Sequence, residues 1–304
     1  MSKIESDLLL AVSDLHQVPS GAYNIRENGA AVDKKSTENI EIVPKTDGKG
    51  IDIFVKDGTV NESLHIPVII TKTGIKELVY NDFHIGKNCD ILIVAGCGIH
   101  NTGSQDSEHN GIHSFFVGKN SKVKYVEKHL GVGTKGGKIL NPITNIKLAD
   151  GAELIMETTQ LGGVTSSIRE TNAKLNKAAK LLIKEKILTN ESQIADTYFN
   201  VELLGEDSSV EVISRSVAKE NSKQKFYSKV IGKAKSFGHV ECDAILMDKA
   251  VIQSTPEILA ECTEATLVHE AAIGKIAGEQ LTKLMTMGLT EKEAEDMIIK
   301  GFLG

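Results

Sequence analysis

The chain has 304 residues, 40% of them apolar, so it can bury a sizeable core in one elongated domain or two compact ones. Its aromatic fraction is only 4%, whereas Gly, Val, Ile and Thr are frequent, which favours many short strands and argues against an all-helical fold. The net charge of -6 argues against a nucleic-acid-binding groove, because such a groove needs clustered Lys and Arg.

The N-terminal segment is acidic, and no stretch approaches the roughly 18 apolar residues of a membrane-spanning helix. These features predict a cytoplasmic protein with no membrane partner. Four cysteines in a chain of this length do not form a disulfide framework, so reduced thiols are expected.

A short amphipathic helix is predicted near the N-terminus. Between residues 3 and 16 apolar side chains recur at helical spacing, and Pro and Gly follow: Ile4, Leu8, Leu9, Val12 and Leu15, then Pro19 and Gly21. We assign residues 1–25 to this helix and a linker.

A repeating unit runs through the middle of the chain. Each unit has a small residue, a polar one, a Val, Leu or Ile, a variable residue and a usually large apolar one, with spacings of 32, 31, 27, 29, 30 and 27 residues. The units start at Cys89, Ser121, Ala152, Ala179, Ser208, Gly238 and Ala265. Alternation of this kind is typical of strands with one buried face.

Strands that recur about every 30 residues, with turn signals between them, indicate a right-handed parallel β-helix in which each unit forms one coil. An antiparallel sandwich is the alternative, but hairpins would not explain why one column of the repeat stays small in every unit. We assign residues 26–272 to the β-helix.

Cys242 and His269 fill the same slot of this repeat, and by parity that slot points inward. They are therefore expected on neighbouring rungs, about 4.8 Å apart along the stack. A thiolate and a neutral imidazole form the soft ligand set of iron-sulfur or zinc chemistry, although each residue taken singly is also explained as packing. Glu270 follows His269 and is expected to point outward.

The early cysteines are expected to serve a different step. Cys89 and Cys97 lie five units before Cys242, roughly 24 Å along the axis, so they cannot share its metal within one chain. They either receive sulfur or meet matching groups of a second chain. Cys262, in the turn before the last unit, is a possible third ligand or a surface thiol. The secondary candidates are Cys262, Glu241, His113 and Cys89.

Two other patterns compete as functional sites. The run from Gly131 to Gly136 fits GxGxxG, but a strand-like segment follows it instead of the helix that a phosphate loop requires. A second set resembles loose zinc-ligand spacing, although no tight CxxC accompanies it: Cys97, His100, His109 and His113. A zinc-dependent enzyme and a structural β-helix with inert cysteines both remain open.

The chain is predicted to end in a helical hairpin over residues 273–304. The segment from Ile276 to Met287 forms one helix, and Thr290 begins a second with Glu293 in a capping box. The hairpin either covers the open end of the β-helix or presents an apolar face to another protein. The candidate docking residues are Leu281, Leu284, Met285, Met297, Ile298 and Phe302.

Several runs of residues in the C-terminal part occur together in a distinctive order and spacing over about 65 residues. They are Gly238–Leu246, Pro256–Ile258, His269–Ala271, Glu279–Leu281, Met287–Thr290 and Gly301–Leu303, with a weaker set at Gly96–Cys97 and His113–Tyr125. With these runs the chain resembles the SufB/SufD family, the scaffold subunits of the SUF iron-sulfur cluster assembly machinery.

The resemblance carries functional implications. In that family the residues matching Cys242, His269 and Glu270 lie where the nascent cluster forms, at an interface between two scaffold subunits. The cysteine matching Cys97 is implicated in accepting sulfur, which is relayed along the β-helix, and the C-terminal helices dock a SufC-type ABC ATPase. Cys242 makes SufB the closer relative, whereas Val268 stands where many SufB members carry a further Glu.

From this resemblance we expect a short, minimal SufB-like scaffold that is not itself an enzyme. It would receive sulfide and iron, build and transfer a labile iron-sulfur cluster of the 4Fe-4S type, and form a homodimer in place of the SufB–SufD heterodimer. ATP hydrolysis would belong to the SufC-like partner.

Overall fold

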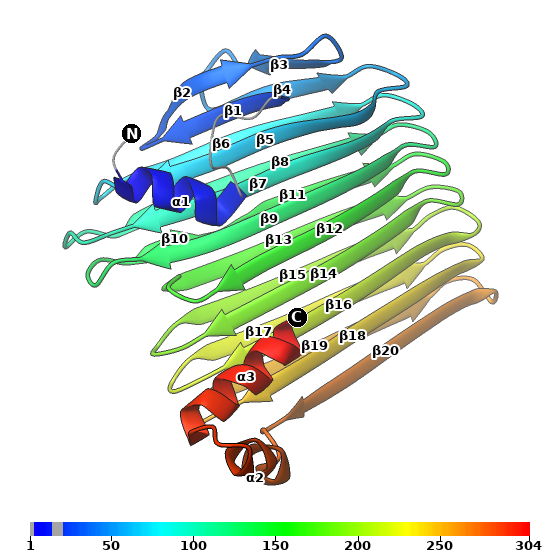
Figure 1. Cartoon of the computed structure of the whole chain (residues 1–304). Coiled ribbons are helices and arrows are strands. Elements are labelled where there is room, and N and C mark those ends of the chain that lie inside the picture. Colours follow the sequence, from blue (N-terminus) through cyan, green and yellow to red (C-terminus); the bar gives the residue numbers. More distant parts are fainter. Residues whose placement is uncertain (1–2, 14–20) are drawn as a thin grey trace.

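The computed structural model describes residues 3–13 and 21–304. Two ten-stranded sheets face each other and form the walls of an elongated solenoid (Figure 1). Sheet A contains, in spatial order, β2 (Ala30–Lys35), β1 (Ala22–Glu27), β5 (Val60–Ile70), β7 (Asp90–His100), β9 (Lys122–Val132), β12 (Glu153–Leu161), β14 (Lys180–Thr189), β16 (Ser208–Ala218), β18 (Ser236–Leu246) and β20 (Ala265–Gly274).

Sheet B forms the opposite wall. It contains, in spatial order, β19 (Val251–Ala260), β17 (Lys223–Gly232), β15 (Ile194–Leu203), β13 (Ser166–Leu175), β10 (Lys138–Leu140), β8 (Ser107–Val117), β6 (Lys76–Ile85), β4 (Gly50–Val55) and β3 (Ile40–Pro44). The tenth strand, β11 (Ile143–Leu148), continues the row of β10, because both pair with β8 and β13.

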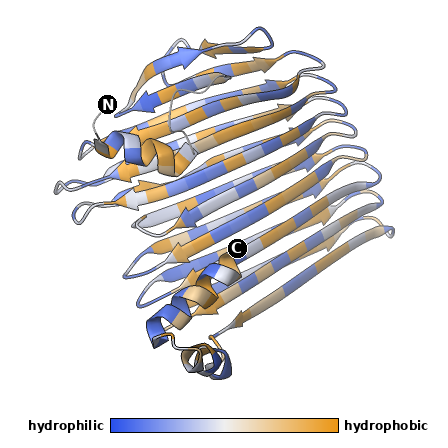
Figure 2. Cartoon of the chain, viewed as in Figure 1, coloured by the Kyte–Doolittle hydropathy of each residue, from blue (hydrophilic) through white to orange (hydrophobic). Residues whose placement is uncertain are grey.

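Strands of successive coils pair in parallel, which confirms the predicted β-helix and excludes the sandwich. Antiparallel pairing occurs at the N-terminal end, where β1 pairs with β2 and β3 with β4. Buried and exposed positions alternate along most strands, and Figure 2 shows this as alternating apolar and polar bands. One apolar cluster fills the interior along much of the stack, with Phe83, Phe115, Tyr125 and Phe199 among its largest fully buried side chains.

The predicted repeat register is wrong at one unit. Ser208 pairs with Ser236, and Ser236 with Ala265, so β18 enters its unit two residues earlier than Gly238. Gly238 instead lies between Val210 and Leu267, in a column of large side chains. A Cβ built on Gly238 would lie 2.8 Å from Leu267 Cδ2 and 3.0 Å from Val230 Cγ1, so neighbouring side chains occupy its space. The glycine was mistaken for the small residue that opens each unit.

Three helices lie outside the sheets. The helix α1 (Lys3–Ser13) packs Leu8 and Leu9 against Ile69, which confirms the N-terminal helix within the described residues. The predicted helix positions 14–16, which include Leu15, and Pro19 after them lie outside the described residues. At the other end are α2 (Gly278–Thr286) and α3 (Glu291–Leu303), where the predicted capping box of Thr290 and Glu293 is present. None of the described helices is long and apolar enough to cross a membrane.

The interior packing can be tested with two phenylalanines that differ mainly in burial. Phe199 is 1% exposed and Phe237 is 48% exposed. We expect Phe199→Ala to lower the free energy of unfolding by about 3–5 kcal/mol through cavity formation, and Phe237→Ala to change it little. Denaturant unfolding of both variants measures the difference. Equal effects would contradict this description of the core.

Candidate site at the C-terminal end of the β-helix

Cys242 and His269 both face the interior on the last two strands of sheet A. Cys242 pairs with Ser214 on one side and Ala271 on the other, whereas His269 pairs with Val240. The two candidates are therefore diagonal neighbours in adjacent columns, about 8 Å apart at Cα by strand geometry, and the expected shared column is wrong. The inward orientation expected for both is correct.

The polar atoms around Cys242 have unfilled bonding capacity. His269 Nε2 and Ser254 Oγ, the latter on β19 in the opposite wall, are buried and have no hydrogen-bond partner among the described residues. Burial raises the pKa of the Cys242 thiol to about 11, with the nearby Ser254 hydroxyl acting in the opposite direction. Burial, and secondarily His239, lower the pKa of His269. A neutral imidazole and a thiol on the inner face of neighbouring strands are ligand types that suit a soft metal or sulfide.

The acidic candidates lie on the outer face of the same strands. Glu270 is exposed and lies 3.9 Å from His239 Nε2 through its Oε2, on the face opposite to His269. Glu241 pairs with Glu270 on this face, and burial followed by Asp243 raises the pKa of Glu241. Neither carboxylate reaches Cys242 through the wall of its own chain.

The remaining cysteines are distant from Cys242. Cys97 lies on β7, five strands away along sheet A, which agrees with the expected separation of about 24 Å. Cys262 lies in the turn before β20. The start of β20 is about six residues, or roughly 20 Å along the strand, from Ala271, which pairs with Cys242. Cys89 is buried, and its thiol donates to the carbonyl oxygens of Lys56 at 3.2 Å and Lys87 at 3.6 Å. Its contacts are those of a packed structural thiol.

The zinc set assembles only in part. Cys97, His109 and His113 face the interior, whereas His100 shares the parity of Gly98, the face that α1 covers. Across residues 3–13 and 21–304 no group of three or more His, Cys, Asp and Glu side chains has a geometry suited to a metal ion. Zinc-dependent catalysis by these four residues therefore lacks a geometric basis.

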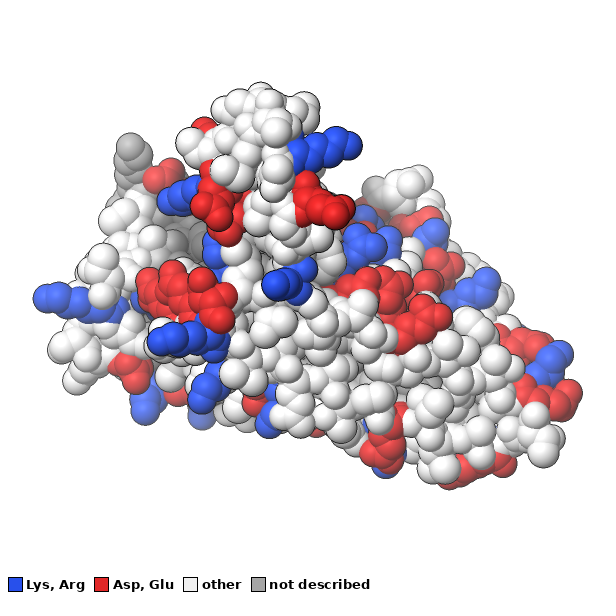
Figure 3. All heavy atoms as spheres, turned by 90° about the horizontal axis from the view of Figure 1, so that it is seen from below, with Lys and Arg blue, Asp and Glu red and all other residues white. Residues whose placement is uncertain are grey.

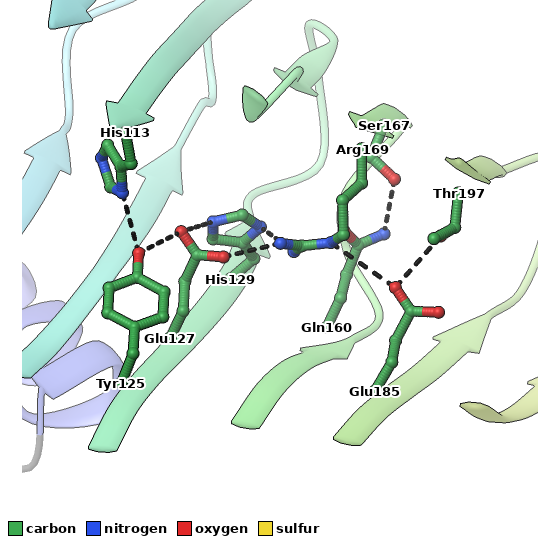
Figure 4. Close-up of polar contacts among 9 residues, drawn as sticks. All are labelled: His113, Tyr125, Glu127, His129, Gln160, Ser167, Arg169, Glu185 and Thr197. Carbon is green, nitrogen blue, oxygen red and sulfur yellow. Dashed lines mark hydrogen bonds and ion pairs between the residues drawn. The ribbon is translucent and has the colours of Figure 1, made fainter. Parts of the chain in front are cut away.

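A chain of buried polar side chains runs along the interior from the rung of Cys97 toward that of Cys242 (Figure 4). His113 Nδ1 lies 2.8 Å from Tyr125 Oη, and Tyr125 donates to Glu127 Oε1 at 3.0 Å. The second oxygen of Glu127 accepts from Arg169 at 2.6 Å. The Arg169 side chain, on β13 of sheet B, thereby connects the two walls.

Arg169 extends the chain by two further contacts. Its Nη2 lies 3.2 Å from His129 Nδ1, and its Nε lies 3.5 Å from Glu185 Oε1. Glu185 accepts from Ser214 at 2.9 Å, and Ser214 is the strand neighbour of Cys242. Through these contacts the polar interior reaches the candidate site.

The pKa shifts follow from burial and pairing. Burial raises the pKa of a carboxyl group, but His129 and Arg169 together hold that of Glu127 well below its usual range. The pKa of Glu185 is raised by burial, because its partners offset only part of that penalty. Glu127, Arg169 and Glu185 were missed at the sequence level, although charged residues in inward positions of the repeat would have revealed them.

The candidate docking residues fall into two groups. Met285 and Met297 are 44% and 51% exposed, and Leu281, Leu284 and Ile298 are half-buried. Phe302 packs with Ile299 and Leu303 of α3 against Val217 and Ile245 of sheet A. The expected apolar face of α3 is therefore used partly within the chain, and the most exposed of the candidates are Met285 of α2 and Met297 of α3.

The buried network predicts a specific acid sensitivity. Burial lowers the pKa of His113 from 6.5 to about 4, so the unfolded chain binds a proton first. The stability from this group is present above pH 6.5 and is lost as pH falls toward 4, by about 3 kcal/mol in full. We expect His113→Gln to flatten the fall of unfolding free energy over this range. Denaturant unfolding against pH measures it, and identical profiles would refute the assignment.

Comparison with known proteins identifies the family to which the chain belongs. The family model described as "SUF system FeS cluster assembly, SufBD core domain" matches residues 80–302. This range contains Cys97, Cys242, His269 and both C-terminal helices.

Two similar proteins show how the chain relates to its relatives. An iron-sulfur cluster assembly SufBD family protein of Archaeoglobus fulgidus is 32% identical over 230 residues, 75% of this chain and 61% of that protein. One from Methanocaldococcus jannaschii is 28% identical over 289 residues, 93% of this chain and 90% of that protein. The chain thus spans less than two thirds of the first relative and most of the second. On the family match, this chain belongs to the SufBD core family of the SUF system for iron-sulfur cluster assembly.

Proposed function

We propose that this protein is a cytoplasmic scaffold on which an iron-sulfur cluster is built as cargo, at Cys242 and His269, and from which it is transferred. The observation that carries the proposal is that Cys242 and His269 face inward on neighbouring strands, and that His269 Nε2 is buried with no hydrogen-bond partner among the described residues. Thiolate and imidazole are established ligands of iron in clusters. Their place on the last strands makes the site accessible from the open end of the solenoid.

One chain supplies too few ligands for a cluster of the 4Fe-4S type, which needs a ligand for each iron. The edges of β19 and β20 have no further strand beside them among the described residues, and this end carries exposed apolar side chains of Val251, Ile258 and Ile273. Figure 3, which views this end, shows uncharged side chains over much of the surface. An edge of this kind favours pairing with another copy, so we propose a homodimer. Glu270, on the outer face, would then act across the interface.

Cys97 is proposed as the point at which sulfur enters the scaffold. Its thiol faces the interior at the start of the polar chain that ends at Ser214. Burial, Glu77 and Glu127 raise its pKa well above the usual range, so the resting thiol is protonated. Sulfur would move toward Cys242 along the polar side of the interior.

A SufC-like ABC ATPase is the proposed partner of the C-terminal helices. The GxGxxG run from Gly131 to Gly136 is followed by the strand β10 and not by the helix of a phosphate loop, and we assign ATP hydrolysis to the partner. Met285 of α2 and Met297 of α3 are exposed and flexible apolar side chains, which are suited to a docking surface.

Anaerobic reconstitution with iron and sulfide tests the cluster site. We expect the wild type to give the absorption and Mössbauer spectra of a 4Fe-4S cluster, and Cys242→Ala to lose them because a thiolate ligand is gone. Cys89→Ala is the matched control, since this thiol is also buried but contacts only carbonyl groups. Molar mass measured alongside the iron content should give one cluster per two chains.

Two results would count against the scaffold. One is tightly bound zinc without any cluster, and the other is a cluster that survives in Cys242→Ala. A cluster on a monomer would remove the homodimer from the proposal and leave the rest.

Docking is tested by placing charges on the exposed methionines. We expect Met285→Glu with Met297→Glu to abolish co-purification with a SufC-like ATPase, because an unpaired charge buried at an interface is costly. Val32→Glu is the control, since Val32 is equally exposed but lies on β2 at the opposite end. If the methionine variant still binds the ATPase, the docking surface lies elsewhere.

A further inference from the structure

A small interior cavity adjoins Cys97. It has a volume of about 20 Å³, and its polar lining consists of Cys97, Asn81, His109, His113, Glu127 and His129, with Gly111 and neighbouring apolar residues completing it. One water-sized molecule needs about 10–15 Å³ and two to four polar partners. The cavity therefore has room for one small molecule.

Glycine at position 111 creates this space. A Cβ built there would lie 3.3 Å from His113 Nε2 and 3.4 Å from His109 Nε2, so both imidazoles border the position that a side chain would take. The backbone of Gly111 does not adopt a positive φ, and conformation alone therefore does not require glycine. The missing side chain is what keeps the cavity open.

The cavity contains an acceptor without a donor. Asn81 is 5% exposed, its Nδ2 donates to His113 Nε2 at 3.2 Å, and its Oδ1 is buried with no partner. His109 Nδ1 lies 3.1 Å from Glu77 Oε2, an arrangement that leaves Nε2 directed at the same space. A small molecule that donates hydrogen bonds would satisfy Asn81 and His109 together.

Access to Cys97 is restricted to small molecules. The thiol is 1% exposed and faces inward, and α1 packs on the outer face of its strand. A Cβ on Gly96 would lie 2.5 Å from the carbonyl oxygen of Val12, which leaves no gap between helix and strand. A persulfide carried on the loop of a donor protein cannot reach this thiol in the described conformation.

The surroundings also favour a neutral occupant. Burial, and after it Glu77 and Glu127, raise the pKa of Cys97, and the same surroundings would raise that of another sulfur acid placed beside it. A neutral hydride of sulfur with two donor hydrogens matches both the charge and the acceptors of the cavity.

We propose that the cavity over Gly111 binds one molecule of hydrogen sulfide beside the Cys97 thiol, without a covalent bond, as the form in which sulfur enters. This rests on the proposed role in cluster assembly and names its sulfur substrate as inorganic sulfide.

Anaerobic crystals of the full chain soaked in sodium sulfide provide the test. Anomalous diffraction near the sulfur edge distinguishes sulfur from oxygen, and the chain's own cysteines serve as internal standards. We expect an additional sulfur peak in the cavity, in contact with Asn81 Oδ1 and separate from Cys97 Sγ. Water alone, an empty cavity, or sulfur bonded covalently to Cys97 would each overturn the proposal.

Three variants link the peak to the cavity. Gly111→Ala fills the space and should remove the peak, whereas Gly301→Ala should keep it, since no atom lies within 4 Å of a Cβ at Gly301. Asn81→Ala, which leaves the space open, should lower the occupancy and covers the case in which Gly111→Ala does not fold. The initial rate of cluster formation at limiting sulfide should fall several-fold in Gly111→Ala, fall also in Asn81→Ala, and stay unchanged in Gly301→Ala.

The crystal soak and the reconstitution test different claims, so either claim can be refuted while the other stands. A cluster at Cys242 in a protein whose cavity takes no sulfide refutes this inference and leaves the scaffold role intact. A sulfide peak in a protein that forms no cluster refutes the scaffold role and leaves the sulfide site standing.

Discussion

The structure depends on one constraint, which is that an inward-facing side chain of a closed β-helix has no access to water. Every charge placed there must find its partner inside, because an unpaired buried charge is strongly destabilising. Arg169 meets this demand by contacting both Glu127 at 2.6 Å and Glu185 at 3.5 Å, from strands of the opposite wall. The remaining oxygens of these carboxylates bond to Tyr125 and Ser214. Arg169, the two carboxylates, Tyr125 and Ser214 therefore form one linked group.

This linkage divides the interior lengthwise. Phe83, Phe115, Phe199 and their neighbours fill one side of the solenoid with apolar packing, whereas the polar chain follows the other. An apolar interior alone would suffice for stability, and buried ion pairs are weak evidence for a stabilising role. Their placement between the rungs of Cys97 and Cys242 fits a chain that handles a polar or sulfur-containing species along its axis.

Much of the fold could be predicted from the sequence because each coil repeats the same physical requirement. Small residues at turns and alternating apolar residues in strands recur with every unit, so the β-helix and its inward parity could be read directly. The register between neighbouring strands could not be predicted as surely, because shifting a strand by two residues preserves the alternation of inward and outward side chains. Gly238 shows the reason. It is small because the side chains of Leu267 and Val230 occupy the space beside it, not because it opens a unit of the repeat.

The candidate site was predictable only in part, for a related reason. Cys242 and His269 were identified by residue type and resemblance, and their inward orientation followed from parity. Their diagonal relation depends on the register, and the unpartnered atoms of His269 and Ser254 depend on which side chains meet across the two walls. The pattern of residues along one strand does not indicate which side chains of the opposite wall it will contact. The same limit hid Arg169, whose partners come from a different sheet.

The two functional thiols differ in what their burial permits. Cys97 is enclosed on both faces of its strand, by the polar chain inside and by α1 outside, so the molecules that reach it are limited by size. Cys242 is equally buried but lies one strand from an open edge, with unsatisfied atoms beside it. Enclosure suits the admission of a small reactant, whereas an edge suits the assembly and release of something larger. With the first deep in the stack and the second at its end, the polar side chains around Arg169 lie in the interior between them.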